Sequence, residues 1–223
     1  GAGDAWPCWA LSNHDVIRYA TRHLPYAQNP AQQGKLMATL HLSLRGSICI
    51  YEGDELGLTE ADLALEDLVD PYGIRFWPEF NGRDGCRTPM VWEAEAVNAG
   101  FSTVKPWLPV PQTHLAKAVD QQVGKPESQY ELYKAMIAWR RTSRALTKGS
   151  VRFLESDGDV LAFLREAGDE KVLCVFNFGR TGAGFPVPAG LSVAATADLG
   201  FASRVVEDMV TLPAESAFVA KVK

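Results

Sequence analysis

Asn13, His14 and Asp15 are the first residues of the chain whose types and spacing could do chemistry. They follow the apolar stretch Trp6–Leu11, and a fixed cation, Arg18, comes four residues after His14. A buried strand that ends in polar side chains is typical of a site at the rim of a sheet or barrel, and a nearby arginine keeps a carboxylate ionised. The same residues also fit a strand followed by an Asn/Asp turn with an ordinary histidine, so both interpretations stay open at this point.

Two strands and a helix are expected to position this polar cluster. The apolar run of Trp6, Trp9, Ala10 and Leu11 predicts the first strand. Asn29-Pro30 predicts the N-cap and first position of a helix that ends at Gly46. One face of this helix carries the apolar residues Leu36, Met37, Leu40 and Leu44.

The second predicted strand, Ser47–Tyr51, is short and apolar, which favours burial on both faces. It runs into a second polar cluster, Glu52-Gly53-Asp54-Glu55. The order strand, helix, strand is that of a βαβ unit in a parallel sheet or barrel. Ligands of such folds bind at the carboxyl ends of the strands, where both polar clusters lie.

Residues 56–126 have no clean periodicity and many prolines, which predicts a long loop region. Loops of that length are uncommon in a compact domain and are usually functional when ordered. Within it, Gly82–Met90 combines turn residues with Arg83 and Arg87. These arginines are either a pair of surface cations or groups that brace carboxylates in a site.

The last third of the chain changes from helical to period-two patterning. A helix is predicted over 128–145, with arginines 140, 141 and 144 as its C-terminal cap and solvated face. From Gly149 onward the pattern predicts a hairpin of 151–154 with 160–165, a strand over 171–178, and weaker strands near 185–187, 205–209 and 217–222. The expected structure is a small antiparallel β-sandwich.

Composition limits the classes of partner. The 223 residues are 47% hydrophobic and carry a net charge of −5 without a basic cluster, which argues against a nucleic-acid partner. No apolar run reaches transmembrane length, so we expect no membrane partner and a cytoplasmic location.

The four cysteines lie far apart in the sequence and lack the spacing of a metal site. We therefore expect free thiols, no metal and no cofactor, although a disulfide stays open as an alternative. The chain starts without Met, which suggests a processed, truncated or engineered start.

Three motifs occur in order: Ser12-Asn13-His14-Asp15, Tyr51–Leu58 and Gly82–Met90. Together with the β-sandwich they resemble the C-terminal part of α-glucosidases of glycoside hydrolase family 13, the α-amylase family, in the branch that contains oligo-1,6-glucosidase. The resemblance implies an α/β plus all-β fold, in which about the last two β/α units of a (β/α)₈ TIM barrel precede a small antiparallel β-sandwich. The domains would then be 1–147, with the long loop at about 56–126, and 148–223.

The resemblance also implies roles for five residues. Asp15 would be the carboxylate that stabilises the transition state, and His14 would hydrogen-bond sugar hydroxyls in the −1 subsite. Arg87 would be an arginine on the substrate side, with Arg18 and Arg83 bracing the pocket. The family's nucleophile Asp and acid/base Glu lie on earlier strands, upstream of residue 1, so we expect this chain to be inactive alone.

Two positions depart from the branch: Glu52 replaces a usual Gln, and Val91 replaces Pro or Gln. Substrate preference therefore stays open among α-glucosidases, sucrose hydrolases, and isomaltulose or trehalose synthases. A non-catalytic scaffold is a further alternative, although such relatives tend to lose the site residues retained here. Asp54 and Glu55 are expected to hydrogen-bond within the barrel end rather than catalyse.

The expected partners follow from the same resemblance. An oligosaccharide or glucoside is the expected substrate. Two isolated barrel strands leave open edges and apolar faces. We therefore expect either the missing N-terminal barrel portion or self-association to cover them.

Overall fold

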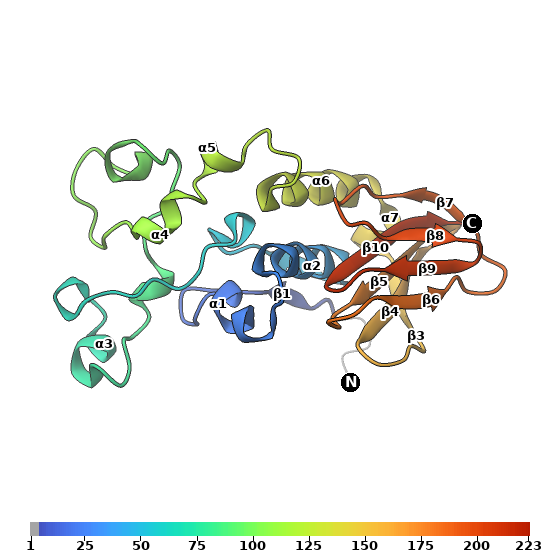
Figure 1. The fold of residues 1–223 in the computed structure, drawn as a ribbon, viewed down its shortest axis with the longest axis horizontal. Coiled ribbons are helices and arrows are strands. Elements are labelled where there is room, and N and C mark those ends of the chain that lie inside the picture. The colour runs from blue at the N-terminus through green and yellow to red at the C-terminus, as the bar shows by residue number, and fades with distance from the viewer. Residues whose placement is uncertain (1–4) are drawn as a thin grey trace. The chain divides into compact units, whose positions relative to one another are not determined.

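A computed structural model describes residues 5–223 (Figure 1). Contacts between Cα atoms divide these residues into two compact units. We call 5–9, 27–48 and 132–223 the sandwich unit, and 10–26 and 49–131 the loop unit. The expected boundary at residues 147 and 148 stays a prediction, since by contacts α2 and most of α6 fall in the same unit as the β-domain strands.

Two antiparallel sheets form most of the sandwich unit (Figure 1). The five-stranded sheet has the order β3 (Ser150–Leu154), β4 (Val160–Ala167), β5 (Glu170–Asn177), β10 (Ser216–Val222) and β7 (Val193–Thr196). The three-stranded sheet has the order β6 (Ala183–Pro186), β9 (Met209–Leu212) and β8 (Arg204–Val206). The predicted hairpin is confirmed, with Phe153 opposite Phe163.

Alternate residues of the central strands are buried in two different cores. Phe163 of β4 and Phe176 of β5, whose ring centroids are 5.6 Å apart, pack in a core with helix residues such as Met136. Leu164 of β4 packs instead in the core that contains Val210 of the second sheet. This period of two is what places one face of a sheet against helices and the other against a second sheet.

Helix α2 (Pro30–Ser43) begins where its sequence predicts. The Asn29 side chain accepts hydrogen bonds from the backbone N–H groups of Ala31 and Gln32, and Pro30 needs no donor at the first position. The helix ends at Ser43, three residues before the predicted Gly46. Its burial extends beyond the predicted apolar face, because His41 and Thr39 are also buried.

The helix predicted over 128–145 is in fact two helices, α6 (Gln129–Thr142) and α7 (Arg144–Lys148). Ser143 separates them in an extended conformation, and its hydroxyl accepts a hydrogen bond from the Leu146 N–H as an N-cap. The prediction that Arg140 belongs to a solvated face is wrong. Its guanidinium donates to the carbonyl of Leu42, in the last turn of α2, at 2.7 Å, and to the carbonyl of Gly46, beyond the helix, at 2.8 Å.

Arg165 connects the strands of the sandwich unit to its helices. This side chain on β4 is fully buried and donates to four carbonyls, those of Ser43, Leu146, Gly149 and Ser150, at 2.6–3.0 Å. Burial lowers the pKa of Arg165 to about 10, so the side chain stays charged at neutral pH. Hydrogen bonds to carbonyls compensate for the loss of hydration that a buried charge suffers.

The strands predicted before the two polar clusters are β1 (Cys8–Ala10) and β2 (Ser47–Cys49), which pair in a two-stranded sheet. Both are shorter than predicted, and the expectation that they are buried is wrong for the described residues. Trp9 on β1 is 42% exposed, and β2 has no fully buried residue. A two-stranded sheet leaves one edge of each strand unpaired, and little of the described chain covers its faces.

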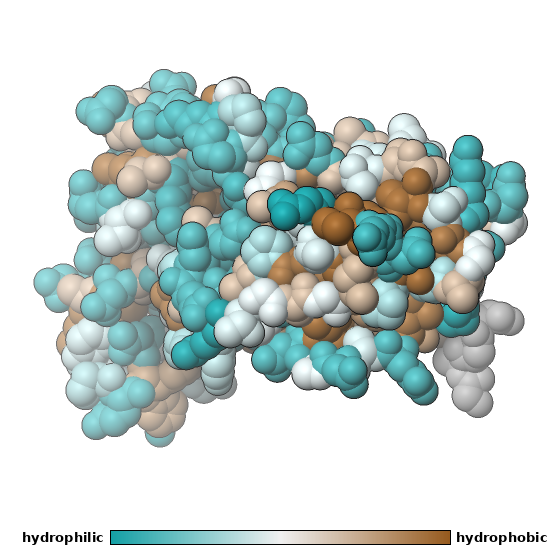
Figure 2. Space-filling view, turned by 45° about the vertical axis from the view of Figure 1, so that its right-hand side comes forward, coloured by the Kyte–Doolittle hydropathy of each residue, from teal (hydrophilic) through white to brown (hydrophobic). Residues whose placement is uncertain are grey.

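The helices that lie entirely within the loop unit are all short. They are α1 (Tyr19–His23), α3 (Pro71–Phe76), α4 (Gln112–Leu115), α5 (Val119–Gln122) and the 3-10 turns Leu24–Tyr26, Asp54–Leu56, Leu65–Asp67, Asp84–Cys86 and Val97–Gly100. Two small hydrophobic clusters order this unit, one around Leu56 and Val91 and one around Leu63 and Leu108. The space-filling view shows further hydrophobic residues, in brown, at the molecular surface (Figure 2). In the described residues no helix is both long and apolar enough to cross a membrane.

Candidate active site

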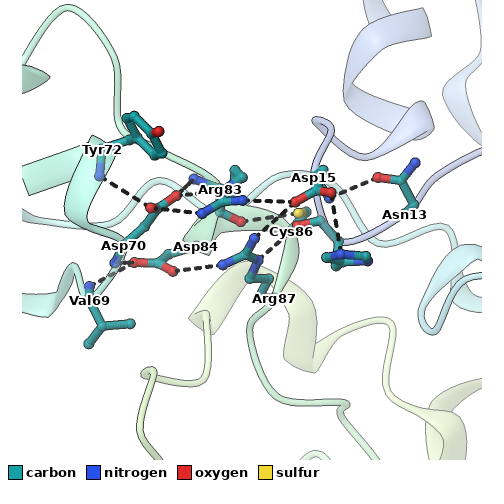
Figure 3. A network of polar contacts seen from close by, with 10 residues as sticks. Asn13, Asp15, Val69, Asp70, Tyr72, Arg83, Asp84, Cys86 and Arg87 are labelled. Carbon is teal, nitrogen blue, oxygen red and sulfur yellow. Dashed lines mark hydrogen bonds and ion pairs between the residues drawn. The ribbon is translucent and has the colours of Figure 1, made fainter.

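Two arginines converge on the carboxylate of Asp15 (Figure 3). Arg83 Nη1 lies 3.0 Å and Arg87 Nη2 lies 3.2 Å from the same oxygen, Oδ1. The Asp15 side chain remains half exposed, so a ligand can reach it. The interpretation of Arg83 and Arg87 as groups that brace a carboxylate therefore holds over that of two unrelated surface cations.

Arg83 is itself held by the buried carboxylate of Asp70. Its Nε lies 2.8 Å from Asp70 Oδ2 and its Nη2 lies 3.1 Å from Oδ1, a bidentate arrangement. These hydrogen bonds hold the pKa of Asp70 well below its usual range, against the opposing effect of burial. Asp70 also caps α3 by accepting from the Tyr72 N–H, so one carboxylate orders both the helix start and the arginine.

Arg87 contacts the polar cluster at two points. Its Nε donates to the backbone carbonyl of His14 at 2.7 Å, and its Nη2 reaches Asp15. Asp84, which is fully buried, lies 4.0 Å away from Arg87 Nη1 and accepts the N–H groups of Val69 and Asp70 at 2.7 Å each. Arg83 and Arg87 therefore flank one turn, Asp84–Cys86, and the Asp84 carboxylate of that turn holds the backbone at Val69 and Asp70.

His14 and Asn13 complete the cluster at Asp15. The His14 Nε2 lies 3.3 Å from Asp15 Oδ2, and the imidazole is 70% exposed. Asn13 Oδ1 accepts the Asp15 N–H at 2.8 Å, which is an Asx-type turn. The two interpretations of these residues are therefore compatible. The Asn/Asp turn fixes the backbone of Asp15, and the Asp15 side chain contacts the two arginines.

Arg18 has a different environment from Arg83 and Arg87. Its side chain is fully buried and its Nη2 lies 2.6 Å from Glu52 Oε1, while its guanidinium sits 5.3 Å from the Tyr51 ring centroid. The Arg18 backbone N–H donates to Glu60 at 2.8 Å. Arg18 is therefore placed to support the second polar cluster, and its direct partner is Glu52 rather than Asp15.

Burial dominates the electrostatics of the second cluster. It raises the pKa of Glu52, against the attraction of Arg18, and it raises the pKa of Asp54 to about 6. Asp54 Oδ2 accepts the Tyr51 N–H at 3.3 Å, and the Asp54 carbonyl accepts from Gln129 at 2.7 Å. These contacts agree with the structural role expected for Asp54. Within residues 5–223, no group of three or more His, Cys, Asp or Glu side chains could hold a metal ion.

Sequence reasoning missed the supporting residues Asp70, Asp84 and Glu60. The pair Asp70-Pro71 carries the same helix-start signal as Asn29-Pro30, so the cap was readable from the sequence. The ion pair between Asp70 and Arg83 could not be predicted from the sequence. The two residues are 13 positions apart, and the segment between them has no periodic pattern that shows how it folds back.

Helix-connected strands followed by an antiparallel β-sandwich define the end of an α/β barrel with its appended β domain. The alpha-amylase catalytic domain family matches residues 2–149, and the maltogenic amylase C-terminal domain family matches residues 151–213. The chain belongs to the alpha-amylase family and corresponds to the C-terminal part of its TIM barrel and the β domain that follows.

Individual relatives are consistent with this assignment. A probable alpha-glucosidase of Rhizobium meliloti is 46% identical over 99% of this chain and 40% of its own length. An oligo-1,6-glucosidase of Heyndrickxia coagulans is 31% identical over 84% of this chain and 37% of its own length. The chain thus spans about 40% of the relatives that it matches.

Solved structures show the same architecture. The structure of an alpha-glucosyl transfer enzyme superimposes with a TM-score of 0.88 at 42% identity, over 98% of this chain and 40% of that one. The trehalulose synthase of Pseudomonas mesoacidophila superimposes with a TM-score of 0.82 at 29% identity, over 100% of this chain and 44% of that one. The resemblance to the α-amylase family inferred from the three motifs is therefore confirmed.

Proposed function

We propose that this chain supplies part of the glucose-binding site of a retaining α-glucosidase. The observation that carries the proposal is the convergence of Arg83 and Arg87 on Asp15, with His14 beside it. Relatives named as glucosidases support the general activity. Asp15 is the group proposed to stabilise the transition state, and His14 and Arg87 are proposed to bind the sugar.

The chemistry explains why a third carboxylate is useful. Retaining hydrolysis passes through an oxocarbenium-like state and needs a nucleophile and an acid/base carboxylate about 5 Å apart. Asp15, preorganised by two arginines, gains attraction as positive charge develops on the sugar ring. Arg83 and Arg87 hold the Asp15 carboxylate in place while leaving half of its side chain exposed. The nucleophile and acid/base groups would come from the remainder of a longer protein.

The finer substrate preference is proposed as hydrolysis of terminal α-linked glucose from oligosaccharides or glucosides. Sucrose isomerisation and glucosyl transfer are the rival activities, because structures of a trehalulose synthase and an alpha-glucosyl transfer enzyme also match. Product analysis of the full-length protein on maltose, isomaltose and sucrose separates them. Free glucose as the main product is expected, whereas accumulation of an isomerised disaccharide would overturn the preference.

A second experiment tests whether the chain contains only part of the site. The purified 223-residue chain is expected not to hydrolyse p-nitrophenyl α-glucoside, while the full-length protein does. Turnover by the chain alone that Asp15→Asn abolishes would contradict the proposal. A cytoplasmic location belongs to the same proposal and is supported by the scattered cysteine spacing.

The exposed barrel elements imply a covering partner. Trp6 and Trp9 are each 42% exposed beside the two-stranded sheet. We propose that the N-terminal barrel portion, or a second copy of the chain, covers this surface. Light scattering of the isolated chain is expected to show self-association or precipitation. A monodisperse monomer with a cooperative melt would contradict this part of the proposal.

A further inference from the structure

Glu60 connects the segment that carries Asp15 with the turn that the two arginines flank. Its Oε2 accepts the backbone N–H of Arg18 at 2.8 Å, and its own backbone N–H donates to Thr21 Oγ1 at 2.7 Å. Arg18 is the N-cap residue of α1, and its own side chain does not cap that helix. A carboxylate that accepts the N–H of an N-cap residue acts as the glutamate of a capping box does. Glu60 therefore fixes the start of α1, three residues after Asp15.

The same part of the chain also packs against the turn Asp84–Cys86. The residue after Glu60, Ala61, donates its backbone N–H to the Gly85 carbonyl at 3.0 Å. Gly85 is buried, and a β-carbon added there would lie 2.5 Å from Glu60 Oε1 and 2.6 Å from the Ala61 carbonyl oxygen. These separations are far below a van der Waals contact. The turn can approach Glu60 this closely because glycine has no side chain.

Glu60 also influences the hydrogen bonding within this turn. Burial, followed by the nearby Glu60 carboxylate, raises the pKa of the Cys86 thiol to about 11. The thiol therefore stays protonated at neutral pH, and its Sγ donates to the Arg83 carbonyl at 3.1 Å (Figure 3). The contacts of Glu60 thus extend to the backbone of one of the arginines that contact Asp15.

We propose that Glu60 is a positioning residue that sets the distance between the Asp15 carboxylate and the guanidinium groups of Arg83 and Arg87. The inference rests on the proposed function and deepens it, because only that function gives Asp15 a catalytic role. The ion pairs of 3.0 and 3.2 Å join the Asp15 segment directly to the arginines. Glu60 joins the same two segments a second time, through Arg18 and Gly85. Without Glu60 both segments can shift, and the alignment on which transition-state stabilisation depends is lost.

A double-mutant cycle in the full-length protein tests this inference, with α-glucosyl fluoride as the substrate. Glu60→Ala is expected to lower kcat about 10- to 30-fold and to change KM less than about threefold, because Asp15 acts on the transition state. In an Asp15→Asn background, Glu60→Ala is expected to lower kcat less than about threefold, since the carboxylate that it aligns is already absent. A role in general stability would instead lower activity by the same factor in both backgrounds.

Three further variants sharpen the comparison. Glu60→Gln keeps an oxygen that can accept the Arg18 N–H and should retain more than about a third of the wild-type kcat. Thr21→Val keeps the side-chain shape but removes the acceptor of the Glu60 N–H, and it should lower kcat about threefold. Glu66→Ala removes an exposed glutamate of the same unit and is the matched control, which should keep the wild-type kcat.

The outcomes separate this inference from the proposed function. Equal losses from Glu60→Ala in the wild-type and Asp15→Asn backgrounds would overturn the inference, and so would an unchanged kcat. If Glu60→Ala does not fold, Thr21→Val is taken through the same cycle, and the same two results overturn the inference. Failure of the wild-type protein to turn over α-glucosyl fluoride would instead refute the proposed function before any variant is compared.

Discussion

Arg83 joins two carboxylates, with its Nη1 3.0 Å from Asp15 Oδ1 and its Nε 2.8 Å from Asp70 Oδ2. Asp70 is buried, whereas Asp15 is half exposed. The buried carboxylate therefore fixes the arginine, and the arginine in turn fixes the carboxylate that a ligand can reach. The orientation of Asp15 depends on a residue that it does not itself contact.

Replacing Asp70 with Asn should weaken the fold in a pH-dependent way. The pKa of Asp70 is held below its usual value, so its stabilisation is fully present above about pH 4 and is lost as pH falls through the folded-state pKa. The full-length wild type should exceed Asp70→Asn in unfolding free energy by about 1–3 kcal/mol at pH 6–7. Denaturant melts across pH measure this. A difference that does not shrink below pH 4 would show that the carboxylate charge is not responsible.

Asp54→Asn should have the opposite pH signature. Burial raises the pKa of Asp54 to about 6, so the folded state binds a proton that the unfolded state releases near pH 4. Wild-type stability should therefore fall as pH rises from about 4 to 6, by about 1–3 kcal/mol for this group. Asn keeps an oxygen to accept the Tyr51 N–H and removes the fall. The exposed Asp62→Asn is the control, and an identical pH dependence in Asp54→Asn and wild type would refute the assignment.

Arg87→Lys should impair activity of the full-length protein even though the charge is kept. A lysine ammonium cannot reproduce the fork that reaches the His14 carbonyl at 2.7 Å and Asp15 at 3.2 Å. We expect kcat/KM to fall about 10- to 100-fold through misalignment of Asp15. The exposed Arg75→Lys on α3 serves as the control and should retain wild-type activity. Equal activity of both variants would mean that charge alone matters at position 87.

Arg165→Ala should be among the most destabilising single substitutions in the sandwich unit. It removes a fully buried guanidinium and leaves four carbonyls without their donor. The expected loss is about 3–5 kcal/mol of unfolding free energy, measured by denaturant titration. Arg152→Ala removes an exposed arginine paired with Glu166 at 3.3 Å and should cost less than about 1 kcal/mol. Similar losses in the two variants would contradict the role given to Arg165.

The parts of the fold governed by local rules were predictable from the sequence. Asn29-Pro30 marks the start of α2, and the alternation around Phe163 marks a strand with two buried faces. The break at Ser143 was missed because apolar spacing continues through it, while the actual cap depends on one side-chain hydrogen bond.

The site was predictable only as a set of residues. The motifs pointed to Asp15, His14 and the two arginines, but spacing does not reveal which groups meet across a segment without periodicity. The pairing of Arg18 with Glu52 and of Arg83 with Asp70 arises from tertiary packing of short turns. The prediction that β1 and β2 are buried was wrong for a related reason. An apolar run shows that a strand can be buried, but its burial depends on other segments that pack against it, and few of the described residues do so.

The most direct test of the central claim is the kinetic effect of Asp15→Asn in the full-length protein, with α-glucosyl fluoride as substrate. If Asp15 stabilises the transition state, kcat and kcat/KM should fall together by at least about 100-fold. Asp62→Asn, which removes an exposed carboxylate, is the control and should remain at the wild-type rate. An Asp15→Asn enzyme that keeps more than about a third of wild-type kcat/KM would contradict the account.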